Sequence, residues 1–157
     1  MVETNGRNFD LLTLGQVLLR LSPPDNERLS RGDTFVKQVG GAELNVAVGA
    51  ALLGLHTGVI SKLPAHDIGS FMKGKIRSFG VSDDFFMYDQ SPAARVGIYY
   101  YENGAYPRKP KVIYDRNHSS FFSLDIDEIP EEVYTASKCF HTTGITLALN
   151  GDIRETP

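Results

Sequence analysis

A pair of glycines followed by a long apolar run, from Gly40 to Leu55, constrains the fold more than any other stretch of this sequence. Gly40 and Gly41 lack a Cβ atom, so the backbone there can adopt positive φ angles or lie directly against a ligand. The apolar residues that follow recur with helical spacing, at Leu44, Val48, Ala51, Leu52 and Leu55. The opposite side is also mostly apolar, which predicts a helix buried around most of its circumference. Gly49 costs such a helix about 1 kcal/mol relative to Ala, so we expect it to pack closely on a neighbouring element.

A polar amide, Asn45, falls in the first turn of this apolar helix. Helix N-termini present free N–H groups and a partial positive charge. A polar ligand could therefore contact the Gly41 backbone and the Asn45 amide together. The spacing alone is also compatible with Asn45 capping a backbone group without any ligand, and both interpretations stay open at this point.

Composition excludes several classes of protein. The 157 residues suffice for one ordinary domain, and the net charge of −3 without a basic run argues against nucleic acid as a partner. No apolar run reaches the length of a membrane span, and the polar N-terminus has no signal-peptide core. Cys139 is the single cysteine, which excludes an intrachain disulfide and favours a cytoplasmic location. We expect its side chain to be buried as a small hydrophobe.

Strand and helix patterns alternate through much of the chain. Strands are expected at 10–15, 57–61, 84–88 and 138–144, with helices over 42–55 and 68–79 between the first three. This order predicts β-α-β units and a parallel sheet. Asp67 is the predicted N-cap of the second helix, whose inner face would carry Phe71, Ile76 and Phe79.

The last part of the chain has weaker patterns. An acidic stretch from Asp127 to Tyr134 predicts a short helix, and Asn150 is expected to begin another. His141 lies within the fourth predicted strand and is interpreted as a half-buried structural imidazole. No Asp or Cys stands near it at zinc spacing, so we expect no zinc site.

A second group of extended segments has no helices between its members. These segments predict a small separate antiparallel sheet and lie at 17–21, 35–39, 95–101 and 111–116.

The two-residue period of strands places specific side chains together on this small sheet. Gly97, Tyr99 and Tyr101 share one face, and so do Val112, Tyr114 and Arg116. A face of this kind could cover a polar ligand. The alternative is that the tyrosines occupy strand positions that favour aromatic residues, and the pattern does not decide between the two.

Neither common nucleotide-binding motif is present. The first strand runs into Gly15-Gln16-Val17-Leu18 rather than a G-x-G-x-x-G turn, and no Walker A pattern occurs.

The sequence resembles the N-terminal half of PfkB-type, ribokinase-like carbohydrate kinases. Gly40-Gly41-Ala42-Glu43-Leu44-Asn45 is similar to the first family signature, Gly-Gly-x-x-x-Asn, and Lys62 to Gly69 resembles the Asp-x-Gly helix start of the family. Within the family, the 2-keto-3-deoxygluconate kinases are most similar, through 19–24, 40–43, 112–116 and 144–146.

The resemblance implies a ribokinase-like three-layer α/β/α fold with a parallel sheet, incomplete in this chain, and a small antiparallel β lid. The main body would comprise 9–15, 41–92 and 118–157, and the lid about 16–40 and 93–117. In the family the lid covers the sugar and in many members forms the dimer contact, so a homo-oligomer is expected.

The resemblance also implies a set of substrate-binding residues, namely Gly40, Gly41, Asn45, Tyr99, Tyr114 and Arg116. The guanidinium of Arg116 suits a carboxylate, because its planar fork forms strong charge-assisted hydrogen bonds. Gln16 departs from the family, which often has an acidic residue at this position.

The expected function is ATP-dependent phosphorylation of a sugar acid, 2-keto-3-deoxygluconate, by the parent enzyme in the cytoplasm. The alternatives are a kinase of a neutral sugar such as fructose or ribose, or a non-catalytic sugar-binding or dimerisation fragment. The second family signature, Gly-Ala-Gly-Asp, does not occur, so the C-terminal catalytic half is expected to be absent. We therefore assign no catalytic residue and no ATP or Mg²⁺ ligand here, and expect residues 1–157 alone to be inactive.

Overall fold

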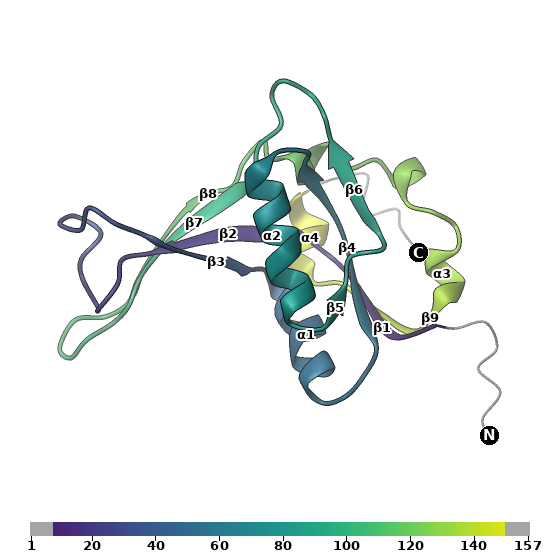
Figure 1. The fold of residues 1–157 in the computed structure, drawn as a ribbon, viewed down its shortest axis with the longest axis horizontal. Coiled ribbons are helices and arrows are strands. Elements are labelled where there is room, and N and C mark those ends of the chain that lie inside the picture. Colours follow the sequence, from purple (N-terminus) through teal and green to yellow (C-terminus); the bar gives the residue numbers. More distant parts are fainter. Residues whose placement is uncertain (1–7, 150–157) are drawn as a thin grey trace.

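A parallel β-sheet forms the centre of the main body in the computed structural model, which describes residues 8–149 (Figure 1). Its strands are β1 (Phe9–Leu14), β4 (Thr57–Pro64), β5 (Val81–Ser82), β6 (Phe86–Asp89) and β9 (Ser137–His141). The strand order is β5-β4-β1-β9, and β6 pairs with the second half of β4. Every pair is parallel, which confirms the prediction from the alternating pattern.

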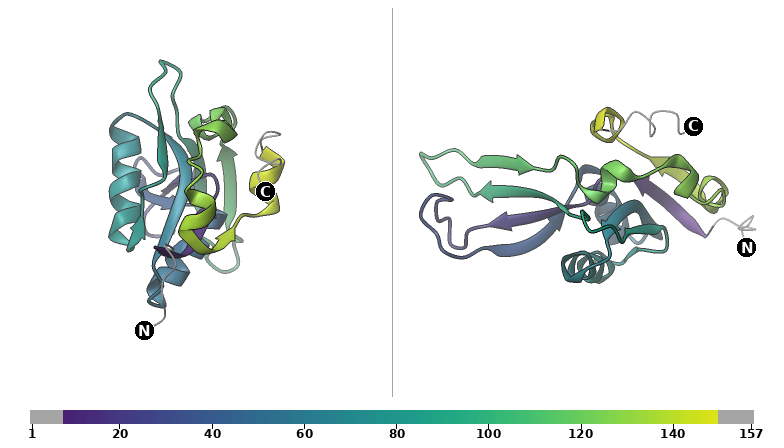
Figure 2. Two further views of the ribbon diagram at one scale, coloured as in Figure 1. Left: turned by 90° about the vertical axis from the view of Figure 1, so that its right-hand side faces the viewer. Right: turned by 90° about the horizontal axis from the view of Figure 1, so that it is seen from above.

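Helical segments cover both faces of this sheet (Figure 2). On one face lie α1 (Ala42–Leu52) and α2 (Asp67–Ser78), and on the other η1 (Ser120–Ser123), η2 (Ile126–Glu128) and α3 (Val133–Ala136). Each face has its own hydrophobic core, the first including Leu44, Met72 and Val59. The second core includes Phe121 and Leu12. A last helix, α4 (Gly144–Leu149), follows β9.

Helix α1 is less buried than predicted. Leu44 and Ala47 are buried against the sheet, but Leu52 is 78% exposed and Leu53, just after the helix, is 84% exposed. A Cβ atom on Gly49 would meet nothing within 4 Å, so the predicted close packing at Gly49 is also wrong. The reason is geometric: among the described residues, the sheet covers one face of α1 and the other faces solvent.

Helix α2 has a different cap from the one predicted, and its predicted inner face is confirmed at Ile76 but not at Phe79. The cap is His66, whose Nδ1 accepts a hydrogen bond from the Ile68 N–H at 3.2 Å. Met72 and Ile76, four residues apart, point into the core, whereas Phe79 is exposed. Phe71 packs only partly against the core. Phe79 lies at the C-cap, just after the last helical residue, and is therefore not part of the buried face of the helix.

The predictions near the end of the described chain also need correction. Cys139 is exposed rather than buried, because within the described sheet β9 pairs on one side only, with β1. The single acidic helix predicted from Asp127 is divided into the short segments η2 and α3. The helix expected from Asn150 lies outside the described residues, whereas α4 already begins at Gly144.

The lid is a separate four-stranded sheet that extends to the left of the main body in Figure 1. It comprises β2 (Leu18–Ser22), β3 (Val36–Gly40), β7 (Gly97–Glu102) and β8 (Lys111–Asp115), in the order β3-β2-β7-β8. The outer pairs are antiparallel as predicted, but the central pair, β2 and β7, is parallel. β2 and β7 each continue the chain from a parallel strand of the main sheet, so they leave it in the same direction.

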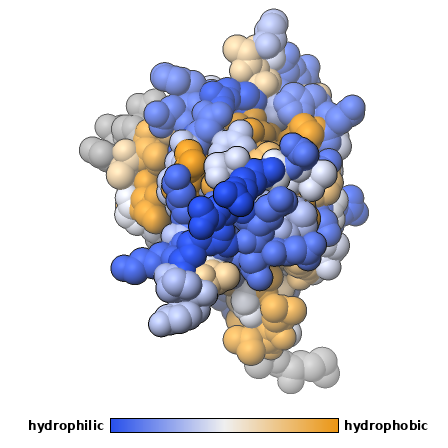
Figure 3. Space-filling view, turned by 90° about the vertical axis from the view of Figure 1, so that its left-hand side faces the viewer, coloured by the Kyte–Doolittle hydropathy of each residue, from blue (hydrophilic) through white to orange (hydrophobic). Residues whose placement is uncertain are grey.

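The surface at the far end of the lid is mostly hydrophilic (Figure 3). Hydrophobic residues gather toward the lower edge of that view, the side on which the C-terminal end of α1 lies. Between residues 8 and 149, no helix has both the length and the apolar character needed to cross a membrane.

Candidate substrate cavity

A cavity of about 430 Å³ lies between the lid and the N-terminal end of α1. Every predicted substrate-binding residue except Gly40 lines it. Its lining residues are Gln16, Leu18, Arg20, Gly41, Ala42, Glu43, Asn45, Tyr99, Tyr101, Val112, Tyr114, Arg116 and Ile145. Residues from five separate parts of the chain therefore meet at one concave site, which is typical of small-molecule sites.

The floor of the cavity is the start of α1. Gly41 is the N-cap residue and has a φ of 148°, which L-residues with side chains rarely adopt. A Cβ atom here would lie 2.6 Å from the backbone oxygen of Gln16. No side chain caps α1, so the interpretation of Asn45 as a backbone cap is not supported. Asn45 instead lines the cavity.

The roof is the inner face of the lid. The register pairs Tyr99 with Tyr114 and Tyr101 with Val112, so the predicted face exists. The rings of Tyr99 and Tyr114 have centroids 6.0 Å apart. Gly40 lies beneath Tyr99, because a Cβ atom at Gly40 would be 2.5 Å from the Tyr99 hydroxyl.

The Tyr99 phenol is a neutral group in this setting. Burial raises the pKa of Tyr99, although the nearby Arg20 guanidinium acts in the opposite direction. Tyr99 thus offers the cavity an O–H donor at neutral pH.

Arg116 is half-buried and is held by Gln16. Its Nε donates a hydrogen bond to Gln16 Oε1 at 2.7 Å. Burial lowers the pKa of Arg116, while Tyr114 and the Glu43 carboxylate oppose this shift. Among residues 8–149, Arg116 forms no ion pair, and its two Nη groups donate no hydrogen bond. These groups are therefore free to bind an anion.

The cavity is also lined by residues outside the predicted set, among them the polar residues Arg20, Gln16 and Glu43. Arg20 lies on the cavity face of β2 with its Cζ 4.3 Å from the centre of the Tyr101 ring. The two-residue period that places Leu18 at the cavity also places Arg20 there, so the signal was present in the sequence. Gln16 and Glu43 had no comparable signal, because their contacts are made with residues distant along the chain.

Glu43 is a buried carboxylate that joins the floor to α4. Its Oε1 accepts hydrogen bonds from the Thr143 N–H at 3.1 Å, the Thr143 hydroxyl at 2.5 Å and the Thr146 hydroxyl at 2.6 Å. Only 2% of Glu43 is exposed. These hydrogen bonds hold the segment that follows β9 against the N-terminal end of α1.

Metal-binding geometry does not occur in the described part of the chain. Between residues 8 and 149, no three His, Cys, Asp or Glu side chains are grouped so that they could hold a metal ion. His141 is half-buried as expected, but its Nε2 has no hydrogen-bond partner there, so the imidazole is not fully satisfied. These residues do not fit a Mg²⁺ site, and we derive no catalytic step through one.

The glycine-led helix start, the lid and the cavity between them agree with a comparison against protein-family models. The model described as pfkB family carbohydrate kinase matches residues 8–155. The chain belongs to the pfkB family. The resemblance inferred from the Gly40 to Asn45 segment is therefore confirmed.

Individual relatives of this pfkB family chain are named as kinases of sugar acids or related keto sugars. The chain is 37% identical over 147 residues to 2-dehydro-3-deoxygalactonokinase of Haloferax volcanii, covering 94% of this chain and 45% of that protein. It is 30% identical over 149 residues to 5-dehydro-2-deoxygluconokinase 1 of Bacillus cereus, covering 94% and 44%.

A solved structure agrees with the fold. The crystal structure of 2-dehydro-3-deoxygluconokinase from Thermotoga maritima matches with a TM-score of 0.85 and 38% identity, over 90% of this chain and 43% of that one. The pfkB family chain thus spans less than half the length of each of these relatives.

Proposed function

We propose that this chain is the sugar-binding part of an ATP-dependent kinase that phosphorylates 2-keto-3-deoxygluconate. The observation that carries the proposal is the half-buried guanidinium of Arg116, which has free Nη donors in a sugar-sized cavity. A carboxylate is the partner that such a planar pair of donors binds best. The names of the relatives support a sugar acid as the substrate class.

In this proposal the remaining lining residues bind the hydroxyl groups of the sugar. The Gly41 backbone and Asn45 lie at the positive end of the α1 dipole, where polar oxygen atoms are favoured. Tyr99 and Tyr114 supply phenol groups from the roof, and Gly40 sets the height of Tyr99. The lid excludes water from the bound sugar and orients its reacting hydroxyl.

ATP and Mg²⁺ are expected to be held by residues outside this chain. When bound, they supply the γ-phosphoryl group and the positive charge that stabilises its transfer. The part described here contributes binding and orientation, and we assign none of its residues a direct catalytic role. A cytoplasmic location remains part of the proposal.

The test is Arg116→Ala in the full-length enzyme, with steady-state kinetics on 2-keto-3-deoxygluconate and on neutral sugars such as fructose. Loss of a charge-assisted contact should raise the KM for the sugar acid by about tenfold to hundredfold. Binding of neutral sugars should change much less. Arg31→Ala, an exposed arginine in the loop between β2 and β3, is the matched control and should behave as wild type. Equal losses on acid and neutral sugars would contradict the carboxylate role.

A further inference from the structure

Two arginines line the cavity from different strands of the lid, and the proposed function uses only one of them. Arg20 lies on β2 and Arg116 follows β8, so β7 runs between them. The register pairs Arg20 with Tyr99 of β7. Arg116 lies beside Gly97, because a Cβ atom on Gly97 would be 3.4 Å from Arg116 Cβ. The two arginines therefore belong to different rows of the lid sheet, two residues apart.

The two arginines start from well-separated points of the lid and do not converge. Two strand spacings across the sheet and two residues along it place their backbones roughly 12 Å apart. The Arg20 side chain extends toward the row beyond its own: its Cζ lies 4.3 Å from the centre of the Tyr101 ring, and its Nε donates a hydrogen bond to Ser22 Oγ at 2.9 Å. Tyr101 and Ser22 both lie in the row further from Arg116.

These contacts hold the Arg20 guanidinium in place and leave donors free. Between residues 8 and 149, Arg20 forms no ion pair. Its Nε is occupied by Ser22, and the Tyr99 hydroxyl is a further polar neighbour. The N–H groups of its two Nη atoms outnumber this one neighbouring hydroxyl, so donors remain for a ligand in the cavity.

The chemistry of these donors limits what they can bind. A guanidinium has no acceptor, so its free N–H groups bind oxygen atoms of a ligand. In the proposed function Arg116 binds the carboxylate of the sugar acid. The other oxygen atoms of such a substrate belong to its keto and hydroxyl groups, and the separation of the two arginines directs Arg20 to the part of the molecule away from the carboxylate.

We propose that Arg20 is a second substrate-binding guanidinium, which binds a hydroxyl group of the sugar acid at a point separate from its carboxylate. The inference rests on the proposed function and adds a specificity-determining contact to it. A sugar acid engages both arginines, whereas a keto acid without hydroxyl groups engages Arg116 alone. The cavity thereby distinguishes these two classes of acid.

The experiment compares two ligands of the full-length enzyme. 2-Keto-3-deoxygluconate is the substrate, and 2-oxobutanoate, which has the carboxylate and keto group but no hydroxyl group, is measured as a competitive inhibitor. Arg20→Met keeps an unbranched side chain against Tyr101 but has no N–H donors. It should raise the KM for the substrate by about tenfold to hundredfold, as expected for loss of a hydrogen bond to a charged group, and leave the Ki of 2-oxobutanoate unchanged. Arg116→Ala should raise both constants.

Controls and contrary outcomes separate this contact from the proposed function. Arg28→Met, on an exposed arginine between β2 and β3, should leave both constants as in wild type. An unchanged KM in Arg20→Met, or an equal rise in KM and in the Ki of 2-oxobutanoate, would overturn this inference alone. Absence of sugar-acid phosphorylation by the wild-type enzyme would overturn both this inference and the proposed function.

Ser22→Ala provides a second test if Arg20→Met does not fold. It removes the acceptor that holds Arg20 Nε and leaves the guanidinium itself intact. The KM for the sugar acid should rise by about fivefold, with no change in the Ki of 2-oxobutanoate. Arg20→Lys, which keeps a charged donor, should recover part of the affinity lost in Arg20→Met. An unchanged KM in Ser22→Ala together with no recovery in Arg20→Lys would contradict the contact.

Discussion

At the scale of single residues, Glu43 combines burial, charge and full engagement of one carboxylate oxygen. Three hydrogen bonds converge on its Oε1 from Thr143 and Thr146. Hydrogen bonds to charged groups are stronger than neutral ones, and buried donors left without an acceptor are costly. Glu43 therefore stabilises the connection between α1 and α4 while it lines the cavity.

Glu43→Ala should lower the free energy of unfolding by about 3 kcal/mol, because it leaves the donors of Thr143 and Thr146 without their acceptor. Urea unfolding of the full-length protein, followed by circular dichroism, measures this change. Glu131→Ala, on an exposed glutamate, should stay within about 0.5 kcal/mol of wild type. A similar small effect of Glu43→Ala would show that α4 is held by other contacts.

The sequence predicted some site residues and missed others for a physical reason. Tyr99, Tyr114 and Arg116 could be placed on one face because alternation along a strand is a local property. The contact between Gln16 and Arg116 joins residues 100 positions apart, and no local pattern encodes such a pairing. Glu43 and Thr143 are likewise 100 positions apart.

At the scale of elements, the two glycines of α1 have opposite roles. Gly41 has a positive φ and lies against the Gln16 carbonyl, so any side chain there is strained. Gly49 lies in the helix interior with open space around it, so a side chain there meets no obstacle. The sequence motif alone could not separate these roles, because both glycines were expected to make close contacts.

Gly41→Ala should destabilise the full-length protein by about 1 to 3 kcal/mol, as expected for a non-glycine residue forced into a rare conformation. Gly49→Ala should instead stabilise it by about 0.5 to 1 kcal/mol, because Ala favours the helix. Thermal unfolding of both variants provides the comparison. Destabilisation by Gly49→Ala would mean that a further segment of the full protein packs on that side of α1.

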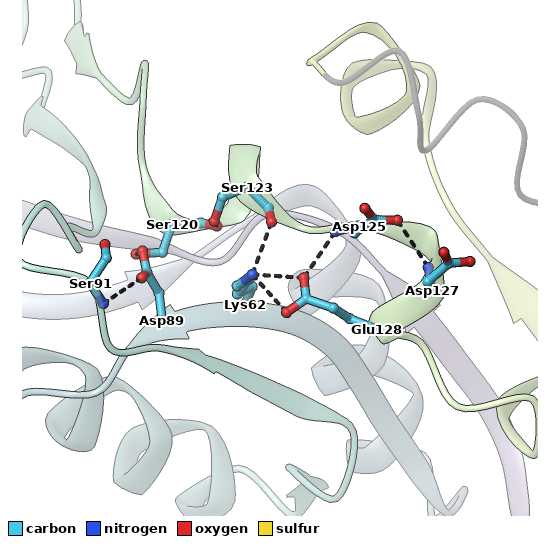
Figure 4. A network of polar contacts seen from close by, with 8 residues as sticks. All are labelled: Lys62, Asp89, Ser91, Ser120, Ser123, Asp125, Asp127 and Glu128. Carbon is cyan, nitrogen blue, oxygen red and sulfur yellow. Dashed lines mark hydrogen bonds and ion pairs between the residues drawn. The ribbon is translucent and has the colours of Figure 1, made fainter.

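A polar network joins the edge of the parallel sheet to the η1 and η2 segments (Figure 4). Lys62 at the end of β4 donates to the Ser123 carbonyl and pairs with Glu128 at 2.7 Å. Asp89 at the end of β6 accepts hydrogen bonds from the Ser91 N–H and the Ser120 hydroxyl. These contacts fix the chain that follows the lid.

The Asp89 contacts predict a pH dependence of stability. The Ser91 N–H, followed by Ser120, lowers the pKa of Asp89 below its ordinary value of 3.8. A carboxylate with a lowered pKa stabilises the fold above its unfolded pKa, and this contribution is lost as the pH falls through the folded pKa. Asp89→Asn should therefore destabilise the protein more at about pH 7 than at about pH 3. Urea unfolding at both values tests this.

The control for this pH experiment is Asp33→Asn, on an exposed residue of the lid loop, which should have a small effect at both pH values. An effect of Asp89→Asn that is independent of pH would show that the shape of the side chain matters rather than its charge.

Elements were predicted well where the pattern was long and apolar, as in β1 and β4, whose residues are mostly buried. The hydrophobic pattern did not predict which strands lie at the edge of a sheet. It gave Cys139 a buried position because it could not show that β9 has a neighbour on one side alone within the described sheet. It also predicted a wholly antiparallel lid, because strand direction across β2 and β7 depends on the main sheet.

At the scale of the whole molecule, the lid carries exposed hydrophobic side chains on both outer strands. They include Val36 on β3 and Ile113 on β8, which are 47% and 44% exposed. The register places them on opposite faces of the lid sheet, since Val36 pairs with Ser22 and Ile113 with Tyr100. On the basis of these exposed side chains we propose that the lid forms a contact between subunits of the full-length protein.

The double substitution Val36→Asp and Ile113→Asp should convert a full-length dimer into a monomer, because it introduces charge into an apolar contact on either face. Light scattering after size-exclusion chromatography measures the mass. Lys109→Asp, on an exposed residue of the β7–β8 loop, should leave the dimer intact. A dimer that persists in the double variant would place the subunit contact elsewhere.

The lid joins the main body through four chain segments: between β1 and β2, β3 and α1, β6 and β7, and β8 and η1. A lid attached through a single hairpin can move by changes of backbone torsion angles in its two connecting segments. This lid is attached at four junctions, so any tilt requires torsion-angle changes in all four. Gln16 and Gly41 each lie in one of these junctions, and Arg116 lies in a third. Tilting the lid would therefore move the Arg116 guanidinium and the N-terminal end of α1 together, so closure over a ligand would also align the groups that we propose bind it.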